Sequence, residues 1–164
     1  MNRTRPSPQT ERDPNARRTV LTNRRARHEY EILDTIDAGI ELRGTEVKSI
    51  RAGQVDIQDA YARIENGQVW LHNMHVRPYE HGSHWNEEPR RPRRLLLHRR
   101  EIGQLRVRVE HKGLSLVPLS LFFQRGYAKL EIGLGRGKRL YDRREAIARR
   151  DEERQRQRDL AARE

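Results

Sequence analysis

One stretch of the chain decides the fold: Ala60-Tyr61-Ala62-Arg63-Ile64-Glu65-Asn66-Gly67-Gln68-Val69-Trp70-Leu71-His72-Asn73. Asn-Gly is the pair most typical of a two-residue β-hairpin turn, because both positions of that turn take a positive φ. Apolar residues alternate with polar ones on either side: Ala62 and Ile64 share a face of the first strand, and Val69 and Leu71 a face of the second. The stretch predicts two antiparallel strands, 60–65 and 68–73, each with one face turned to a core.

The segments before this hairpin predict two strands and a short helix. Residues 30–36 are rich in β-branched and aromatic side chains, Asp37-Ala38-Gly39 has the composition of a turn, and 40–42 alternates as a second strand should. Residues 44–53 change period: Thr45 can cap a helix, and Gly53 can end it.

The segments after the hairpin predict a loop, a helix and a second hairpin. Residues 74–79 continue as a strand, and 79–94, with Gly82, Pro89 and Pro92, predict a long exposed loop. Residues 95–111 show a rough helical stripe that Gly113 ends. Residues 114–123 and 127–134 predict strands joined by 124–126, and Pro118 places the first of them at an edge or a bulge.

These elements predict a mainly β fold with some α, containing about six short strands and two or three peripheral helices. Antiparallel hairpins of this number and length favour a small closed barrel over a parallel sheet. We expect three parts: a flexible basic leader over 1–21, a barrel domain over 22–134, and a basic tail over 135–164.

The charge is concentrated at the two ends of the chain. The net charge is +11, with 36% charged and 34% hydrophobic residues, yet residues 28–134 are nearly neutral. A compact body with cationic arms suggests a nucleic-acid partner. The chain has no Cys, which excludes disulfides and a thiol nucleophile, and it has neither an apolar run of membrane-span length nor a signal peptide. We therefore expect a cytoplasmic protein without a membrane partner.

The tail has the composition of a helix without a core-facing side. Beyond Tyr141 its only large apolar residues are Ile147 and Leu160, which are too far apart to form a stripe. We expect disorder in the free protein and a helix on a polyanionic surface. The alternative is a solvated charged tail with no role.

The sequence does not support an enzyme, a cofactor site or a metal site. The glycines of 133–138 lack the spacing of a phosphate loop, and Arg139 follows Lys138 where a Ser or Thr is needed. His72, His75, His81 and His84 have no acidic or Cys partners that would fix a metal. We predict no catalytic residues and no cofactor.

Three cationic clusters favour a nucleic acid instead: Arg24 to Arg27, Arg90 to Arg94, and Arg136 to Arg144. On a small barrel they would follow a phosphate backbone, and Tyr141 offers a ring on which a base can stack. The alternative for Tyr141 is packing against the barrel.

Four blocks of sequence, in this order, resemble the small protein B family of SsrA-binding proteins: Asn23-Arg24-Arg25-Ala26-Arg27-His28-Glu29-Tyr30, Gly44-Thr45-Glu46-Val47-Lys48-Ser49, Leu95-Leu96-Leu97-His98, and Gly137-Lys138-Arg139-Leu140-Tyr141-Asp142-Arg143-Arg144-Glu145. The resemblance covers roughly residues 22–150. It implies a barrel of the oligonucleotide-binding type and an RNA chaperone that carries transfer-messenger RNA (tmRNA) to the empty A site of stalled ribosomes in trans-translation.

The resemblance also implies site residues. The residues implied for the tRNA-like part of the RNA are Asn23, Arg24, Arg25, Arg27, His28, Tyr30, Asp37, Glu46 and Lys48. Those implied for the ribosome, where the tail meets small-subunit rRNA in the decoding centre and the mRNA channel, are Gly137, Lys138, Arg139, Tyr141, Asp142, Arg143, Arg144 and Glu145. Asp37 and Arg143 stand where the family usually has Glu and Lys. The remaining alternative is a ribosomal or ribosome-assembly protein that binds rRNA with the same barrel and arms.

Overall fold

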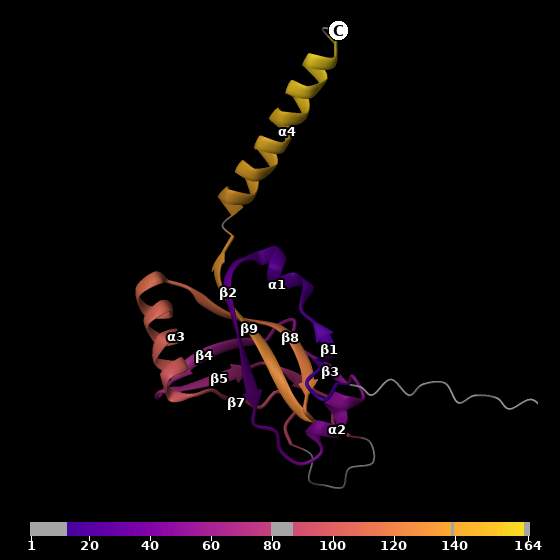
Figure 1. Ribbon diagram of the computed structural model, residues 1–164, viewed down its shortest axis with the longest axis vertical. Helices are drawn as coiled ribbons and strands as arrows, with labels where there is room; N and C mark the ends of the chain where they lie inside the picture. Colours follow the sequence, from indigo (N-terminus) through magenta and orange to yellow (C-terminus); the bar gives the residue numbers. More distant parts are fainter. Residues whose placement is uncertain (1–12, 80–86, 139, 163–164) are drawn as a thin grey trace, which may run out of the picture.

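The computed structural model describes residues 13–79, 87–138 and 140–162 (Figure 1), and side chains of the last segment from 148 onward. These residues form nine strands and four helices, in the following order: β1 Arg18–Thr22, α1 Arg24–Glu29, β2 Tyr30–Ile40, α2 Glu46–Arg51, β3 Val55–Asp56, β4 Tyr61–Glu65, β5 Gln68–His72, β6 His75–Val76, β7 Arg93–Leu96, α3 Arg99–Lys112, β8 Ser115–Gln124, β9 Tyr127–Gly137 and α4 Leu140–Ala162.

The main sheet is antiparallel and closes on itself. Its strand order is β1-β8-β4-β5-β7-β2-β9, and a further pairing of β8 with β9 joins six of these strands into a ring. One edge of β8 pairs with β9 along almost its whole length, while its other edge is shared by β1 and β4. The register of β8 shifts between Pro118 and Ser120, which is the bulge predicted from the proline. The predicted small antiparallel barrel is confirmed.

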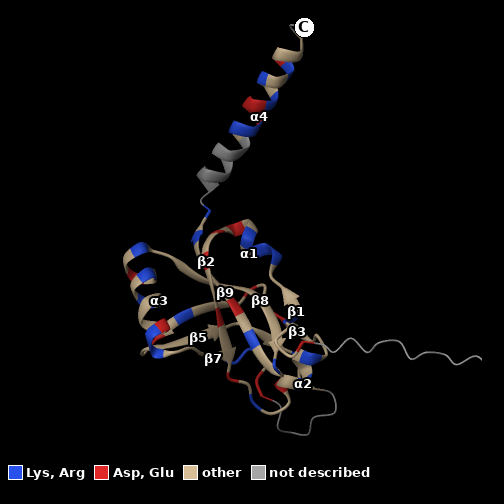
Figure 2. Cartoon of the chain, in the orientation of Figure 1, with Lys and Arg blue, Asp and Glu red and all other residues tan. Residues whose placement is uncertain are grey.

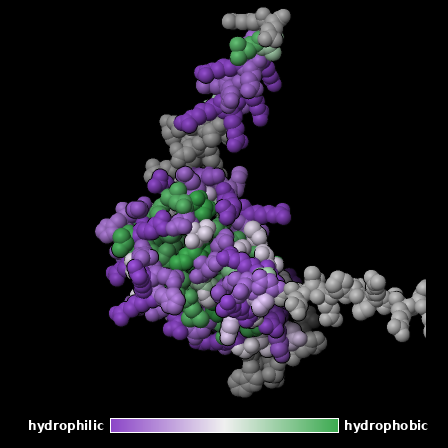
Figure 3. Space-filling model, viewed as in Figure 1, coloured by the Kyte–Doolittle hydropathy of each residue, from purple (hydrophilic) through white to green (hydrophobic). Residues whose placement is uncertain are grey.

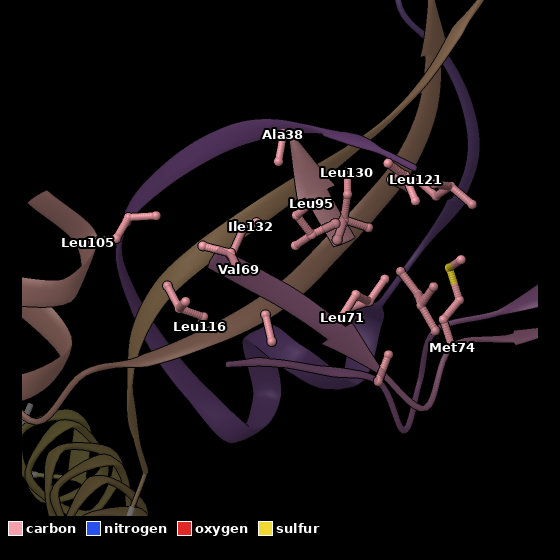
Figure 4. Packing of buried hydrophobic residues seen from close by; sticks show 14 of the residues in the cluster. Ala38, Val69, Leu71, Met74, Leu95, Leu105, Leu116, Leu121, Leu130 and Ile132 are labelled. Atoms are coloured by element: carbon pink, nitrogen blue, oxygen red, sulfur yellow. The ribbon is translucent and has the colours of Figure 1, made fainter. Parts of the chain in front are cut away.

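The hairpin that decides the fold forms as predicted. β4 pairs with β5 from Tyr61 opposite His72 to Glu65 opposite Gln68. Asn66 and Gly67 have φ values of 51° and 73°, as the two-residue turn requires. Val69 and Leu71 are completely buried in the main core, which fills the barrel (Figure 4). Each fully buried side chain of this size contributes about 1.5–3 kcal/mol to folding.

The turn predicted at 37–39 is wrong, because β2 is one strand from Tyr30 to Ile40. Ala38 is buried and lies opposite Leu130 of β9, so the segment belongs to the barrel wall. Gly39 serves close approach rather than a turn: a Cβ at this position would lie 3.2 Å from the Cβ of Leu96 on β7.

The helix predicted over 95–111 begins too early. Leu95 lies in β7, fully buried and paired with Ile40 on one side and Val69 on the other, and α3 starts only at Arg99. Pairing with β2 and β5 makes this leucine-rich segment a strand. Its sequence periodicity alone could not distinguish a strand from a helix. The helix ends at Gly113, which has φ 63°, as predicted.

Ordered structure extends beyond both expected ends of the barrel. β1 lies within the expected leader and pairs with β8, and β9 continues to Gly137. The tail then forms α4, which projects away from the barrel (Figure 1). Figure 3 shows hydrophilic residues over most of its described surface, and Leu160 is 67% exposed. The tail is helical in this structure, and its disorder in the free protein with a helix on a polyanionic surface stays a prediction.

A buried ionic cluster ties α2 to β7. The Arg93 side chain is fully buried, and its Nε donates to Glu46 Oε2 at 2.7 Å and its Nη1 to the Met74 carbonyl at 2.8 Å. Arg91 Nη2 donates to Glu46 Oε1, and the Arg43 N–H donates to the same oxygen at 2.9 Å. Burial, the largest influence, raises the pKa of Glu46, but these hydrogen bonds outweigh it and hold the pKa below its ordinary value of 4.5. Glu46 is therefore ionised inside the protein.

We predict that Glu46→Gln destabilises the protein by about 3–5 kcal/mol at neutral pH, because it leaves the buried Arg93 without a countercharge. Urea unfolding measures this cost. Glu41→Gln is the matched control, since the Glu41–Arg94 pair is only partly buried and its loss should cost less than about 1 kcal/mol.

The same pair of proteins tests the protonation state. A lowered folded-state pKa contributes stability that is present above pH 4.5 and is lost as the pH falls through the folded-state value. Unfolding of the original chain should therefore become easier below about pH 4.5, and Glu46→Gln should flatten that dependence. An equal pH dependence in both proteins would contradict an ionised Glu46.

Candidate nucleic-acid interface

The short helix α1 presents a cationic face because its one small residue is buried. Ala26 is 3% exposed and packs with Val117 and Leu119 of β8 in a second core cluster, to which Tyr30 and Ile32 add partial cover. The other α1 residues, from Arg24 to Glu29, are exposed. The exposed basic residues of α1 are Arg24, Arg25, Arg27 and His28. Figure 2 shows the Lys and Arg positions of this helix in blue.

The arginines of α1 have little local neutralisation. Arg25 Nη1 lies 4.0 Å from Asp59 Oδ1, and both side chains are more than half exposed, so this pair is weak. Arg24 and Arg27 form no ion pair with any described residue. Their charge is therefore available to a polyanion.

Asn23 positions α1 rather than facing solvent. It is 4% exposed, its N–H donates to the Leu119 carbonyl at 2.7 Å, and its Nδ2 donates to the Pro118 carbonyl at 3.1 Å. A longer bond of 3.5 Å reaches the Ile57 carbonyl. Direct RNA contact was implied for Asn23, but its side chain is instead used inside the protein.

The tail begins at α1. In the β2–β9 ladder Gly137 lies opposite Tyr30, and the Lys138 N–H donates to the Glu29 carbonyl at 2.8 Å. Lys138 Nζ donates to the Arg27 carbonyl at 3.2 Å. A cation near the last carbonyls of a helix is also favoured by the helix dipole. Gly137 and Lys138 therefore join the tail to α1. The other implied tail positions have side chains outside the described residues, namely Arg139, Tyr141, Asp142, Arg143, Arg144 and Glu145.

The remaining implied residues do not gather at α1. Asp37 accepts a hydrogen bond from Arg17, which also reaches Glu131 at 3.3 Å and lies 4.5 Å from the centre of the Phe122 ring. Lys48 is exposed on α2, at the opposite end of the barrel from α1 (Figure 1). Glu46 is buried in the ionic cluster described above, so it presents no carboxylate at the surface.

The prediction of an exposed basic cluster from Arg90 to Arg94 is wrong for most of these arginines. Arg91 and Arg93 turn into the protein and neutralise Glu46. Arg94 pairs with Glu41 at 2.8 Å, and Arg90 donates to Asn73 at 2.7 Å. The cluster therefore supplies structure more than free charge.

One cationic group escaped the sequence analysis altogether. Arg18, Arg51 and Arg125 come from three separate segments and line one groove with a volume of about 1110 Å³. Nothing in the sequence pattern signalled that group, because only the closed barrel brings these segments together.

The described residues show no cluster of metal ligands and no membrane-spanning helix. No group of three or more His, Asp or Glu residues among them could hold a metal ion. His72 instead lies 3.0 Å from Glu65 and stacks on Tyr61. None of the described helices is long and apolar enough to cross a membrane.

The model of the family described as "SmpB protein" matches residues 20–162, which is most of the chain. The chain belongs to the SmpB protein family. Curated relatives named "SsrA-binding protein" include that of Carboxydothermus hydrogenoformans, 54% identical over 88% of this chain and 97% of the relative, and that of Moorella thermoacetica, 56% identical over 90% and 96%.

A solved structure of an SmpB protein has a similar fold. It is described as "tmRNA-SmpB: a journey to the center of the bacterial ribosome", and the likeness has a TM-score of 0.62 at 55% identity over 77% of this chain and 93% of that one. The family that the four blocks suggested from the sequence is thus confirmed.

We predict that Asn23→Ala lowers the free energy of unfolding by about 1–3 kcal/mol, because it removes the buried hydrogen bond that Asn23 Nδ2 donates to the Pro118 carbonyl. Hydrogen exchange should also accelerate across residues 24–29, which lose their anchor on β8. Arg24→Ala, an exposed neighbour, should change stability by less than about 0.5 kcal/mol. Unchanged stability and protection in Asn23→Ala would refute a positioning role.

Proposed function

We propose that this protein binds tmRNA and acts with it in trans-translation, as a cytoplasmic factor of bacterial ribosome rescue. The barrel holds the tRNA-like part of the RNA and carries it to the empty A site of a stalled ribosome. The names of the relatives and the description of the similar structure support both partners, the SsrA RNA and the ribosome.

One observation carries the proposal beyond family membership: the tail is joined to the helix that displays the arginines. Lys138 donates to the Arg27 and Glu29 carbonyls, so the cationic face of α1 and the start of α4 share one end of the barrel. An RNA held at α1 therefore has a fixed relation to the origin of the tail. A fixed position of the RNA relative to the tail is needed if the barrel delivers the RNA while the tail enters the ribosome.

The division of residues follows from their exposure. Arg24, Arg25, Arg27 and His28 contact phosphates of the tRNA-like part, and Asn23 and Tyr30 position α1. The tail, including Tyr141 and the charged residues 142–145, enters the decoding centre and the empty mRNA channel. Because the tail and mRNA would compete for the same space, a tail that folds only in a vacant mRNA channel distinguishes stalled ribosomes without mRNA there.

A resident ribosomal or ribosome-assembly protein is not favoured, because the relatives are named for binding SsrA RNA. The protein acts by binding, without a chemical step of its own. Affinity purification of the tagged protein from cells, followed by sequencing of the bound RNA, tests the proposal. Enrichment of tmRNA with substoichiometric ribosomes is expected, whereas one copy on every ribosome would indicate the resident protein.

We predict a steep salt dependence of tmRNA binding. If six to ten phosphates are contacted, affinity should fall by about 10³–10⁵ between 50 and 200 mM salt, because bound counterions are released from the RNA. Arg27→Ala should reduce the slope of log affinity against log salt by about 1. Fluorescence anisotropy at a series of salt concentrations measures both, and a flat response would contradict phosphate contacts.

We also predict that ending the chain after Lys138 separates the two activities. All the strands and both Lys138 bonds to α1 remain, so tmRNA affinity and the urea midpoint should stay close to those of the full chain. Tagging of a stalled peptide in a reconstituted translation system should be abolished. Equal loss of both activities would mean that barrel and tail do not divide the work.

A further inference from the structure

The groove that contains Arg18, Arg51 and Arg125 has no residue of α1 in its lining. It is bounded by β1, the end of α2 and the β8–β9 turn, and its walls also include Phe123 and the chain around Asp13. The β8–β9 turn is at one end of β9 and Gly137, opposite Tyr30, is at the other. Arg125 is therefore separated from Gly137 by most of the length of β9, whereas Arg18, at the start of β1, is close enough along the chain to lie within about 20 Å of Arg24.

The arginines of the groove are cationic without local compensation. All three side chains are exposed, and none of them forms an ion pair with a described residue. Most other arginines that form side-chain contacts on the barrel pair with carboxylates, as Arg17, Arg94 and Arg108 show. The groove contains one acid, Asp13, whose Oδ1 already accepts the Asn15 N–H at 2.9 Å. An anion is therefore the complementary ligand.

The groove also carries an aromatic stack. The Arg51 guanidinium lies 5.4 Å from the centre of the Phe123 ring, which holds this long side chain against β8. A guanidinium supported by a ring presents a flat, cationic surface, and unpaired bases stack on such surfaces in single-stranded RNA. The combination of stacking surface and phosphate-binding arginines favours a nucleotide chain over a simple anion.

The wall next to β1 is fixed in place. Gln124 Nε2 donates to the Asn15 carbonyl at 2.8 Å, and Arg125 Nε donates to Asn15 Oδ1 at 2.6 Å. The groove is thus formed before any ligand arrives. Its volume of about 1110 Å³ exceeds the range of about 300–1,000 Å³ for small-molecule sites, which suits a larger ligand.

We propose that this groove binds a short single-stranded RNA segment, whose phosphates contact Arg18 and Arg125 and one of whose bases stacks on Arg51. None of the lining residues belongs to α1, so one molecule can hold the tRNA-like part at α1 and an unpaired strand in the groove. This site goes beyond the proposed function and does not depend on α1 or on the tail.

The test uses a fluorescently labelled uridine hexanucleotide and the full-length protein, measured by fluorescence anisotropy. Arg51→Ala and Arg125→Ala should each weaken hexanucleotide binding about tenfold and leave tmRNA affinity within about twofold, since a stacked base or charged contact is worth roughly a factor of ten. Arg51→Lys keeps the charge and loses the flat surface, so it should weaken binding nearly as much as Arg51→Ala.

Matched variants assign each outcome. Arg100→Ala removes an exposed arginine of α3, which lies on another side of the barrel, and should not alter hexanucleotide binding (Figure 1). Arg24→Ala should weaken tmRNA and spare the hexanucleotide. Equal losses of hexanucleotide affinity in Arg51→Ala and Arg100→Ala would overturn the stacking site. Full hexanucleotide binding by Arg51→Lys, with a loss only in Arg51→Ala, would overturn it as well. If the protein without substitutions did not bind tmRNA, the proposed function would be overturned instead.

Discussion

The long β9 strand is the constraint on which the rest of the molecule depends. It is hydrogen-bonded to β2 on one edge and to β8 on the other over nearly its whole length. Gly133 and Gly135 permit this double pairing, because a Cβ atom at either position would lie 3.1 Å from the Ile32 side chain. A Cβ atom at Gly133 would also lie 3.0 Å from the Leu119 side chain. The pairing closes the barrel, brings Lys138 to α1 at one end and places Arg125 beside Arg51 at the other.

The basic composition of the chain is divided between interior and surface. Arg93 lies in the barrel wall, and both it and Arg91 pair with Glu46, which connects α2 with β7. A buried ion pair of this kind contributes little net stability, because both charges are desolvated, but it penalises any packing that separates them. Net charge therefore overstates how much cationic surface the barrel offers to a nucleic acid.

The sequence predicted what local chemistry determines. The Asn66-Gly67 hairpin, α2 and the end of α3 at Gly113 all follow from turn residues and periodicity. The predictions from the sequence were wrong where pairing between distant segments determines the conformation. Gly39 allows a close contact between strands, and Leu95 lies in a strand between β5 and β2. The cationic cluster Arg24 to Arg27 was recognised by its residues, but its helix was not predicted. The roles of Asn23 and Arg93 depend on burial, which a pattern of polar residues does not reveal. The groove arginines required the closed barrel.

The outer edge of β1 has a consequence for how this molecule behaves at high concentration. Among the described strands of the main sheet, β1 has one neighbour, β8, and so leaves one edge open. The strand is only five residues long, its register shifts between Thr19 and Leu21, and arginines lie at and before its start. Short, irregular and charged edges resist the addition of a strand from another molecule. The protein can thus display basic chain ends without assembling into fibrils or swapped dimers through this edge.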